Sequence, residues 1–315
     1  MASTRIGART CSISDVARVR NFLVANACFW LDVSVIPADF RVPDFAPGAV
    51  MYQIFPDRFA RSGSSDLTGK LQPFWVHESP DELPEYRPDA HGEVRNNDFF
   101  GGNFAGIREK LPYLQELGVG VLYLNPIFMA WSNHRYDTAD YRRPDPMLGT
   151  EEDFRALCDA AHARGMRVIL DGVFSHTGSN SVYFDAKHVF GHGAASDPNS
   201  PYRRWYRFHH YPDDYEAWWG IRTLPCVEEL DETYLHYIIE DEDSVIAHWL
   251  RLGADGFRLD VVDELPDEFV RACAAGCGRS IRRACCSARS GRTRRTSVPM
   301  AFPAAILSTA SWIPS

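Results

Sequence analysis

The chain lacks a long apolar stretch, and this absence limits where it can act. No apolar run approaches the roughly 18 to 20 residues that a membrane-spanning helix needs, and the apolar segment 21–36 contains Asn and Asp. Residues 1–20 have no compact apolar core followed by small residues, so we expect no secretory signal peptide. The sequence therefore predicts a cytoplasmic protein without a membrane partner.

Paired cysteines are also missing. The chain has eight Cys, and four of them occur singly, at positions 11, 28, 158 and 226. This scatter is more typical of reduced thiols than of a disulfide framework. The other four, Cys273, Cys277, Cys285 and Cys286, do not have the CxxC spacing of a common zinc site. A zinc site is therefore not favoured.

Positive charge is scarce except at the C-terminal end. The formal net charge is −9, and eight of the 33 Lys and Arg lie after Glu268, where no Asp or Glu occurs. The rest of the chain is strongly acidic and so lacks the positive face that nucleic-acid phosphates require. The arginine-rich end has no helical or strand periodicity, which is more typical of an unstructured tail than of a nucleic-acid-binding element. No nucleic-acid partner is predicted.

What the sequence does contain is an alternation of two patterns. Apolar runs rich in β-branched and aromatic residues predict buried strands at 49–59, 119–128, 167–176 and 256–262. Helical spacing of apolar residues predicts helices at 103–118, 151–165 and 232–253. The first helix has its apolar face at Ile107, Leu111, Leu114 and Leu117. Apolar strands that alternate with helices predict a parallel sheet covered by helices.

Two α/β architectures fit this order, a doubly wound sheet and a (β/α)8 TIM barrel. No GxGxxG motif follows the first strand, so a dinucleotide site has no support. Each strand instead ends in polar residues, as in a barrel whose active site lies at its strand ends: Asp57, Asn125, Asp171 with His176, and Arg258 with Asp260. We predict about the first half of a TIM barrel, with a small lobe at 177–230 inserted after the third strand.

Arg258 and Asp260 are the strongest catalytic candidates. Residues two apart on a strand point to the same face, which in a barrel can be the interior. The guanidinium would offset the cost of burying the carboxylate and keep it ionised, as nucleophilic attack on carbon requires. A purely structural ion pair is the alternative interpretation.

Other residues suggest a sugar ligand. His134 and Tyr136 follow the second strand and offer an imidazole donor and a stacking ring, and His176 offers another donor after the third strand. Any one of these alone is more often structural. Residues 202–220 are dense in Trp and Tyr beside carboxylates, which suggests carbohydrate, although a small core within the lobe would explain them too.

Six strings, taken in order over residues 48–270, resemble the α-amylase superfamily, glycoside hydrolase family 13, and most of all its neopullulanase, cyclomaltodextrinase and maltogenic amylase group: YQIFPDRF, FFGGNFAGI, LYLNPIF, SNHRYDTADY, DGVFSH and GFRLDVVDE. A weaker match is LPCVEEL at 224–230. The resemblance implies that Asp260 is the nucleophile that forms a glycosyl-enzyme, that Arg258 is its partner and that Asp171 braces Arg258. It also implies that His134, Tyr136 and His176 line the subsite of the sugar under attack. We add Glu264 to the substrate-binding candidates.

The motifs that the family places next are absent. A retaining enzyme needs a second carboxyl about 5 Å from the nucleophile, which the resemblance places in a GExW motif, and a later His-Asp pair. The sequence contains neither. Asp263, Glu264 and Glu268 lie beyond the strand end or on the next helix and are poor substitutes for the acid.

Residues 271–315 are predicted to be a non-native tail. In a shifted reading frame, allowed codons for residues 284–296 spell VLLGEVWEDASN, which restores a GExW motif at the expected distance. We therefore interpret the Arg- and Cys-rich end as the product of a frameshift near residues 270–272. Residues 1–47 are interpreted as a short remnant of the group's N-terminal β-domain, and 48–270 as the partial barrel.

The predicted function is that of a glycosidase lineage that hydrolyses or transfers α-glucosidic bonds in maltodextrins, cyclodextrins or pullulan by a retaining mechanism. This chain is expected to be inactive because the acid is missing, and a non-catalytic α-glucan-binding or regulatory protein is the alternative. No cofactor is predicted, since the turn at Gly101 and Asn103, where relatives often bind calcium, offers few oxygen ligands. The oligomeric state and the preferred linkage are left open.

Overall fold

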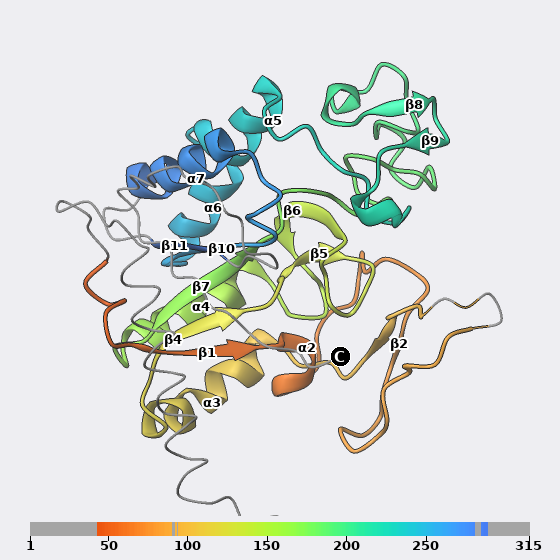
Figure 1. The fold of residues 1–315 in the computed structure, drawn as a ribbon. Coiled ribbons are helices and arrows are strands. Elements are labelled where there is room, and N and C mark those ends of the chain that lie inside the picture. The colour runs from red at the N-terminus through yellow and green to blue at the C-terminus, as the bar shows by residue number, and fades with distance from the viewer. Residues whose placement is uncertain (1–42, 90–91, 93, 281–284, 289–315) are drawn as a thin grey trace, which may run out of the picture. The chain divides into compact units, whose positions relative to one another are not determined.

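The computed structural model describes residues 43–89, 92, 94–280 and 285–288. Its central element is a parallel sheet with the strand order β1, β4, β7, β10, β11 (Figure 1). These strands are Val50–Ile54, Val119–Leu124, Arg167–Gly172, Gly256–Leu259 and Cys285–Ala288. Spatial order follows chain order, as expected for consecutive strands of a barrel wall. The prediction of a partial TIM barrel is confirmed.

Helices connect the consecutive strands of this sheet. They are α3 (Phe104–Glu116), α4 (Glu151–His162), α6 (Val245–Leu252) and α7 (Asp267–Ser280). The smaller elements lie beyond the arrowheads of β1 and β4 in Figure 1, at the carboxyl ends of the strands: α2 (Pro56–Phe59), β2 (Trp75–Val76) with β3 (Asp98–Phe99), β5 (Phe128–Ala130) with β6 (Thr138–Pro144), and β8 (Phe208–His210) with β9 (Asp214–Tyr215).

Helix α3 illustrates how the sequence pattern produces the core. Asn103 caps its N-terminus by accepting a hydrogen bond from the Gly106 N–H. Ile107, Leu111 and Leu114 are fully buried. Leu117, predicted on the same face, is 52% exposed because it is the C-cap residue, one position beyond the last helical turn.

All four predicted strands end earlier in the structure, at Ile54, Leu124, Gly172 and Leu259, and one predicted helix is interrupted. The first strand was expected to reach residue 59, but β1 ends at Ile54, because Pro56, with its fixed φ, starts the short helix α2. The helix expected over 232–253 is interrupted: α5 (Glu232–Leu235) and η3 (His236–Glu240) are followed by a break, after which Ser244 caps α6. A run of acidic residues at 240–243 carries no apolar side chain to continue the buried face.

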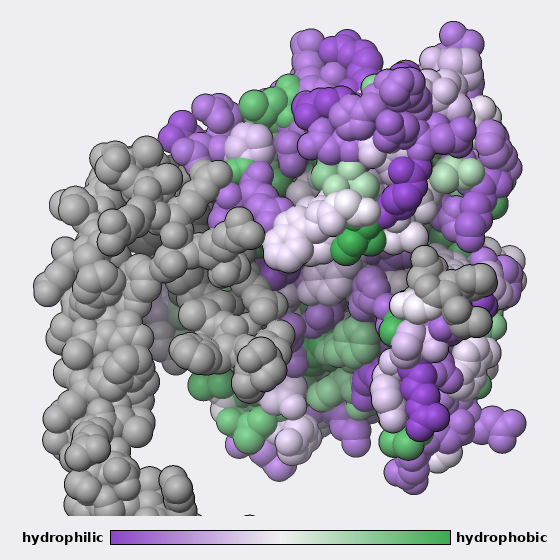
Figure 2. Space-filling model, turned by 45° about the vertical axis from the view of Figure 1, so that its right-hand side comes forward, coloured by the Kyte–Doolittle hydropathy of each residue, from purple (hydrophilic) through white to green (hydrophobic). Residues whose placement is uncertain are grey.

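The lobe between β7 and α5 has an aromatic core of its own. Trp205 and Tyr206 are 2% and 3% exposed, and Phe184 stacks on Phe208 with ring centroids 5.6 Å apart. Most aromatic side chains of 202–220 therefore pack within the lobe. Trp219 is an exception at 70% exposed. On the face drawn in Figure 2, hydrophilic residues predominate and hydrophobic side chains gather in a recess.

Part of the predicted tail is described. Helix α7 continues past residue 270 to Ser280, and residues 285–288 form β11 beside β10. Cys273 and Cys277 are buried free thiols. Most of 1–47, and of 271–315 the residues 281–284 and 289–315, lie outside the described residues. The proposed domain boundaries and the frameshift stay predictions.

Helix α4 supports a first test of local stability. Thr150 and Asp153 form a reciprocal capping box at its N-terminus. Thr150→Ala removes the hydroxyl that accepts from the Asp153 N–H, so urea denaturation is expected to give a free energy of unfolding lower by about 1 kcal/mol. Thr223→Ala, at an exposed lobe position, is the control and should change little. Equal losses in both variants would contradict the capping role.

Candidate active site

The centre of the site is set by the register of β7 and β10. These parallel strands pair Arg258 with Asp171 and Leu259 with Gly172. Both polar side chains are buried, at 3% and 1% exposure. Because the strands run parallel, their carboxyl ends meet at one edge of the sheet. The two groups that the sequence placed at strand ends are thus neighbours.

Arg258 holds two carboxylates together. Its Nη1 lies 2.5 Å from Asp171 Oδ1 and 2.7 Å from Asp260 Oδ1. Asp260 follows the last residue of β10, and its N–H donates to the Gly172 carbonyl at 3.0 Å. Its side chain is 14% exposed. Asp260 is thus the partly accessible member of the group, whereas Asp171 and Arg258 lie beneath the surface.

Asp171 is held by two tyrosines as well as by Arg258. Its Oδ2 accepts hydrogen bonds from the hydroxyls of Tyr123 (2.6 Å) and Tyr136 (3.0 Å). Burial raises the pKa of Asp171 to about 6, although Arg258 opposes the shift. Burial also raises the pKa values of both tyrosines, which keeps their hydroxyls protonated as donors. Tyr123 was not predicted; its place two residues before Asn125 on an otherwise aliphatic strand was the available signal.

The backbone turns sharply after Asp260. Val261 has φ +43°, in the left-handed region that β-branched residues rarely adopt. Such strain persists only where the surroundings impose it, and it is frequent at functional sites. Here the Asp260 N–H bond to β7 and the Arg258 contact fix the residue just before the turn.

The loop between β5 and β6 brings His134 and Tyr136 to this site. Ser132 Oγ and the Tyr136 N–H both lie 3.1 Å from His134 Nδ1, and the two rings are 5.8 Å apart. Asn125, at the end of β4, donates to the Tyr136 hydroxyl at 3.3 Å. Burial lowers the pKa of His134, so the imidazole is neutral at pH 7.

His176 lies beside a second cluster. Its Nδ1 is 2.9 Å from Ser175 Oγ, and its ring stacks on Trp218 with centroids 5.3 Å apart. Its Nε2 is buried and, within the described part of the chain, has no hydrogen-bond partner. Burial lowers the pKa of His176 to about 4, so the ring is neutral at pH 7. A buried, unpaired imidazole nitrogen is costly unless a ligand or water pairs with it.

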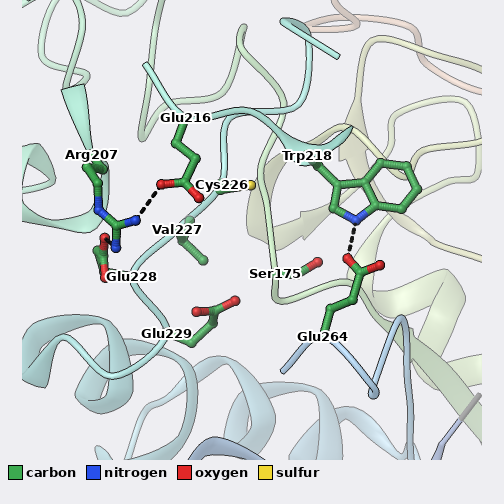
Figure 3. Close-up of a pocket in the computed structure, with 9 residues that line it drawn as sticks. All are labelled: Ser175, Arg207, Glu216, Trp218, Cys226, Val227, Glu228, Glu229 and Glu264. Carbon is green, nitrogen blue, oxygen red and sulfur yellow. Dashed lines mark hydrogen bonds and ion pairs between the residues drawn. The ribbon is translucent and has the colours of Figure 1, made fainter. Parts of the chain in front are cut away.

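A pocket of about 250 Å³ is lined by Ser175 and Trp218 (Figure 3), two residues that contact His176. Its walls combine Ser175 and Trp218 with lobe residues and Glu264: Arg207, Glu216, Cys226, Val227, Glu228 and Glu229 complete the lining. Burial raises the pKa of Glu229 to about 7. The lining includes neither Asp260 nor Arg258, so the pocket does not enclose the ion-pair site. Glu264, whose role in substrate binding stays a prediction, points to the Trp218 indole, which donates to it at 2.8 Å.

The turn at Gly101 and Asn103, where no bound ion was predicted, has its side-chain oxygen engaged in hydrogen bonds. Asn103 Oδ1 accepts hydrogen bonds from the backbone N–H groups of Gly106 and Ser62, and the Gly101 N–H donates to Asp57. Hard cations need several free oxygens, and this oxygen is already engaged. Among the residues that the structure describes, no group of three or more His, Cys, Asp or Glu is arranged to hold a metal.

The structure thus brings most predicted site residues together. Asp171, Arg258, Asp260 and Tyr136 form one connected group, which His134 joins through Tyr136. His176 and Glu264 form a neighbouring group that Trp218 connects. Sequence reasoning missed the connecting role of Trp218, because only the fold of the lobe brings residue 218 to residues 176 and 264.

No helix among the described residues is long and apolar enough to cross a membrane.

Comparison with known proteins gives a consistent result. The family described as "Alpha amylase, catalytic domain" matches residues 53–275. An amylopullulanase from Thermoanaerobacterium thermosulfurigenes is 40% identical over 268 residues, covering 76% of this chain and 14% of that protein. The intracellular maltogenic amylase of Bacillus subtilis strain 168 is 38% identical over 234 residues, covering 73% of this chain and 36% of that protein.

Solved structures share the fold as well. The type III pullulan hydrolase from Thermococcus kodakarensis is 32% identical, with a TM-score of 0.65 over 80% of this chain and 44% of that one. The chain therefore spans less than half the length of these relatives. The family match over residues 53–275, together with this structural similarity, shows that the chain belongs to the α-amylase catalytic-domain family.

Proposed function

We propose that this chain binds α-glucans and carries the nucleophile side of a retaining glycosidase site, with Asp260 as the nucleophile. One observation carries the proposal: Arg258 contacts both Asp171 and Asp260, and of these two carboxylates Asp260 is the partly exposed one. The guanidinium of Arg258 lies 2.7 Å from the Asp260 carboxylate, the group that would attack an anomeric carbon. The names of the relatives, which include an amylopullulanase, a maltogenic amylase and a pullulan hydrolase, support the substrate class.

The acid half of such a mechanism is not evident in this sequence. A retaining glycosidase needs a second carboxyl about 5 Å from the nucleophile to protonate the leaving oxygen. The sequence has no GExW motif, and the oxygens of nearby Glu264 accept from the indole N–H groups of Trp218 and Trp219. Natural α-glucosidic bonds are therefore expected to turn over negligibly on this chain.

A substrate that needs no acid tests the nucleophile directly. With α-maltosyl fluoride, an Asp260 oxygen attacks C1, the C–F bond breaks, and fluoride leaves with the electron pair without needing a proton. The intact-mass spectrum of the full chain should gain one maltosyl residue, because the ester forms without an efficient base to hydrolyse it. Asp260→Asn should remain unmodified.

The control is Asp263→Asn, which keeps a neighbouring carboxylate out of the reaction and should still form the adduct. Adduct formation in Asp260→Asn would contradict the assignment of the nucleophile. The absence of any adduct in a wild-type chain that binds maltohexaose would instead favour a non-catalytic α-glucan-binding protein. That second function is favoured by the missing GExW motif.

A further inference from the structure

Trp219 combines exposure with a strained backbone. Its side chain is 70% exposed, and its φ of +51° and ψ of 27° lie in the left-handed region. A residue other than glycine pays for this conformation, and a large exposed indole gains little from burial in return. Strained residues of this kind concentrate where a side chain must meet a ligand.

Glu264 fixes the orientation of two adjacent indoles. The Trp218 Nε1–H donates to Glu264 Oε2 at 2.8 Å, and the Trp219 Nε1–H donates to Oε1 at 3.0 Å. The two rings stack with centroids 5.2 Å apart and an interplanar angle of 20°. The carboxylate follows β10, on the same segment as Asp260, whereas the indoles belong to the lobe. One acidic residue thus ties a lobe surface to the strand that carries the proposed nucleophile.

The stack also connects to His176. Trp218 stacks on the imidazole with centroids 5.3 Å apart and an angle of 28°, and it stacks on Trp219 as well. Because Trp218 makes both contacts, the exposed indole is one aromatic ring removed from His176, whose buried Nε2 has no partner among the described residues. An apolar ring surface therefore extends outward from a polar group that a sugar hydroxyl could pair with.

We infer that Trp219 is a stacking platform for a glucosyl unit of a bound α-glucan, farther from Asp260 than the unit under attack, and that Glu264 is its positioning residue. This inference rests on the proposed function. The apolar C–H face of glucose packs on an aromatic face, and Glu264 already occupies the indole N–H, so Trp219 offers its face rather than its edge. The site would favour long oligosaccharides over short ones, because only a longer chain reaches beyond the subsite at Asp260.

The test is calorimetric titration of the full chain with maltose and with maltohexaose. Trp219→Ala is expected to weaken maltohexaose binding about fivefold to tenfold, the size of one lost ring contact, and to leave maltose binding within about twofold. Glu264→Ala should give the same pattern, and Glu264→Gln, which keeps one acceptor oxygen, should be intermediate. Trp75→Ala is the matched control, since Trp75 is 44% exposed and lies on β2.

A further variant separates binding from structure. Trp219→Gly removes the ring but suits a positive φ, so its Tm should equal or exceed that of the wild type while maltohexaose binding still falls. A lower Tm for Trp219→Gly, or wild-type affinity of Trp219→Ala for both sugars, would overturn the platform and leave the proposed function standing. A wild-type chain that binds neither sugar would contradict the proposed function, and the platform with it.

Discussion

Replacing Arg258 with Met is expected to lower the free energy of unfolding by about 3–5 kcal/mol, because it leaves buried negative charge without its partner. Arg258 is 3% exposed and lies within 2.7 Å of an oxygen of both Asp171 and Asp260. Methionine fills much of the same volume but supplies no charge. Urea denaturation at pH 7, followed by circular dichroism, measures the loss.

Arg207→Met is the matched control for this variant. Arg207 also bridges two carboxylates, Glu216 and Glu228, but its side chain is 56% exposed. Solvent screens exposed ion pairs, so the loss there should stay below about 1 kcal/mol. Similar losses in the two variants would mean that burial does not govern the strength of the Arg258 cluster. The proposed active site would then lack the preorganised charge on which its chemistry depends.

The stability of the wild-type chain is expected to fall as the pH rises from about 4 to about 6, relative to an Asp171→Asn variant. The pKa of Asp171 is raised from 3.8 to about 6 in the folded chain, mainly by burial. Between these values the folded state retains a proton that the unfolded state has released, so raising the pH favours unfolding. Above the folded pKa the full penalty, on the order of 3 kcal/mol, is present.

The measurement is the difference between the two pH profiles of the unfolding free energy. Other groups titrate alike in both proteins, so the subtraction isolates residue 171. The variant has no titratable group at this position, so the gap, defined as the unfolding free energy of the wild type minus that of the variant, should decrease as the pH rises. Asp213→Asn, an exposed lobe position, supplies the reference curve. A gap that widens between pH 4 and pH 6 would show that Arg258 outweighs burial and lowers this pKa instead.

The strand-end residues could be predicted from the sequence because their positions depend on local pattern and on parallel pairing. A strand with Asp171 and a strand with Arg258, adjacent in a parallel sheet, must bring these side chains to one edge. The spacing of Arg258 and Asp260 likewise gave their shared face, and the contact between them bears this out. For these residues, the positions predicted from the local strand pattern agree with the structure.

The features that were not predicted depend on contacts between residues far apart in the sequence, which no local pattern encodes. The break between η3 and α6 lies at the acidic run 240–243, inside an otherwise helical pattern. Trp218 meets Glu264 across 46 positions of sequence, and Tyr123 meets Asp171 across 48. The sequence did not predict which aromatic residues of the lobe are buried and which are exposed, because their burial depends on the packing of the whole lobe.

The turn at Val261 has a consequence for how the carboxylate of Asp260, the proposed nucleophile, is positioned. Valine disfavours the positive φ that it adopts at position 261. The conformational preference of this segment alone therefore does not orient Asp260. The position of Asp260 is instead fixed by the neighbouring strand β7, because the Asp260 N–H donates a hydrogen bond to the Gly172 carbonyl. A free peptide with the sequence of residues 254–266 would adopt another conformation, and the Asp260 side chain would lose this orientation. The reactivity proposed for Asp260 therefore depends on both strands together, and we expect it to be lost when they separate.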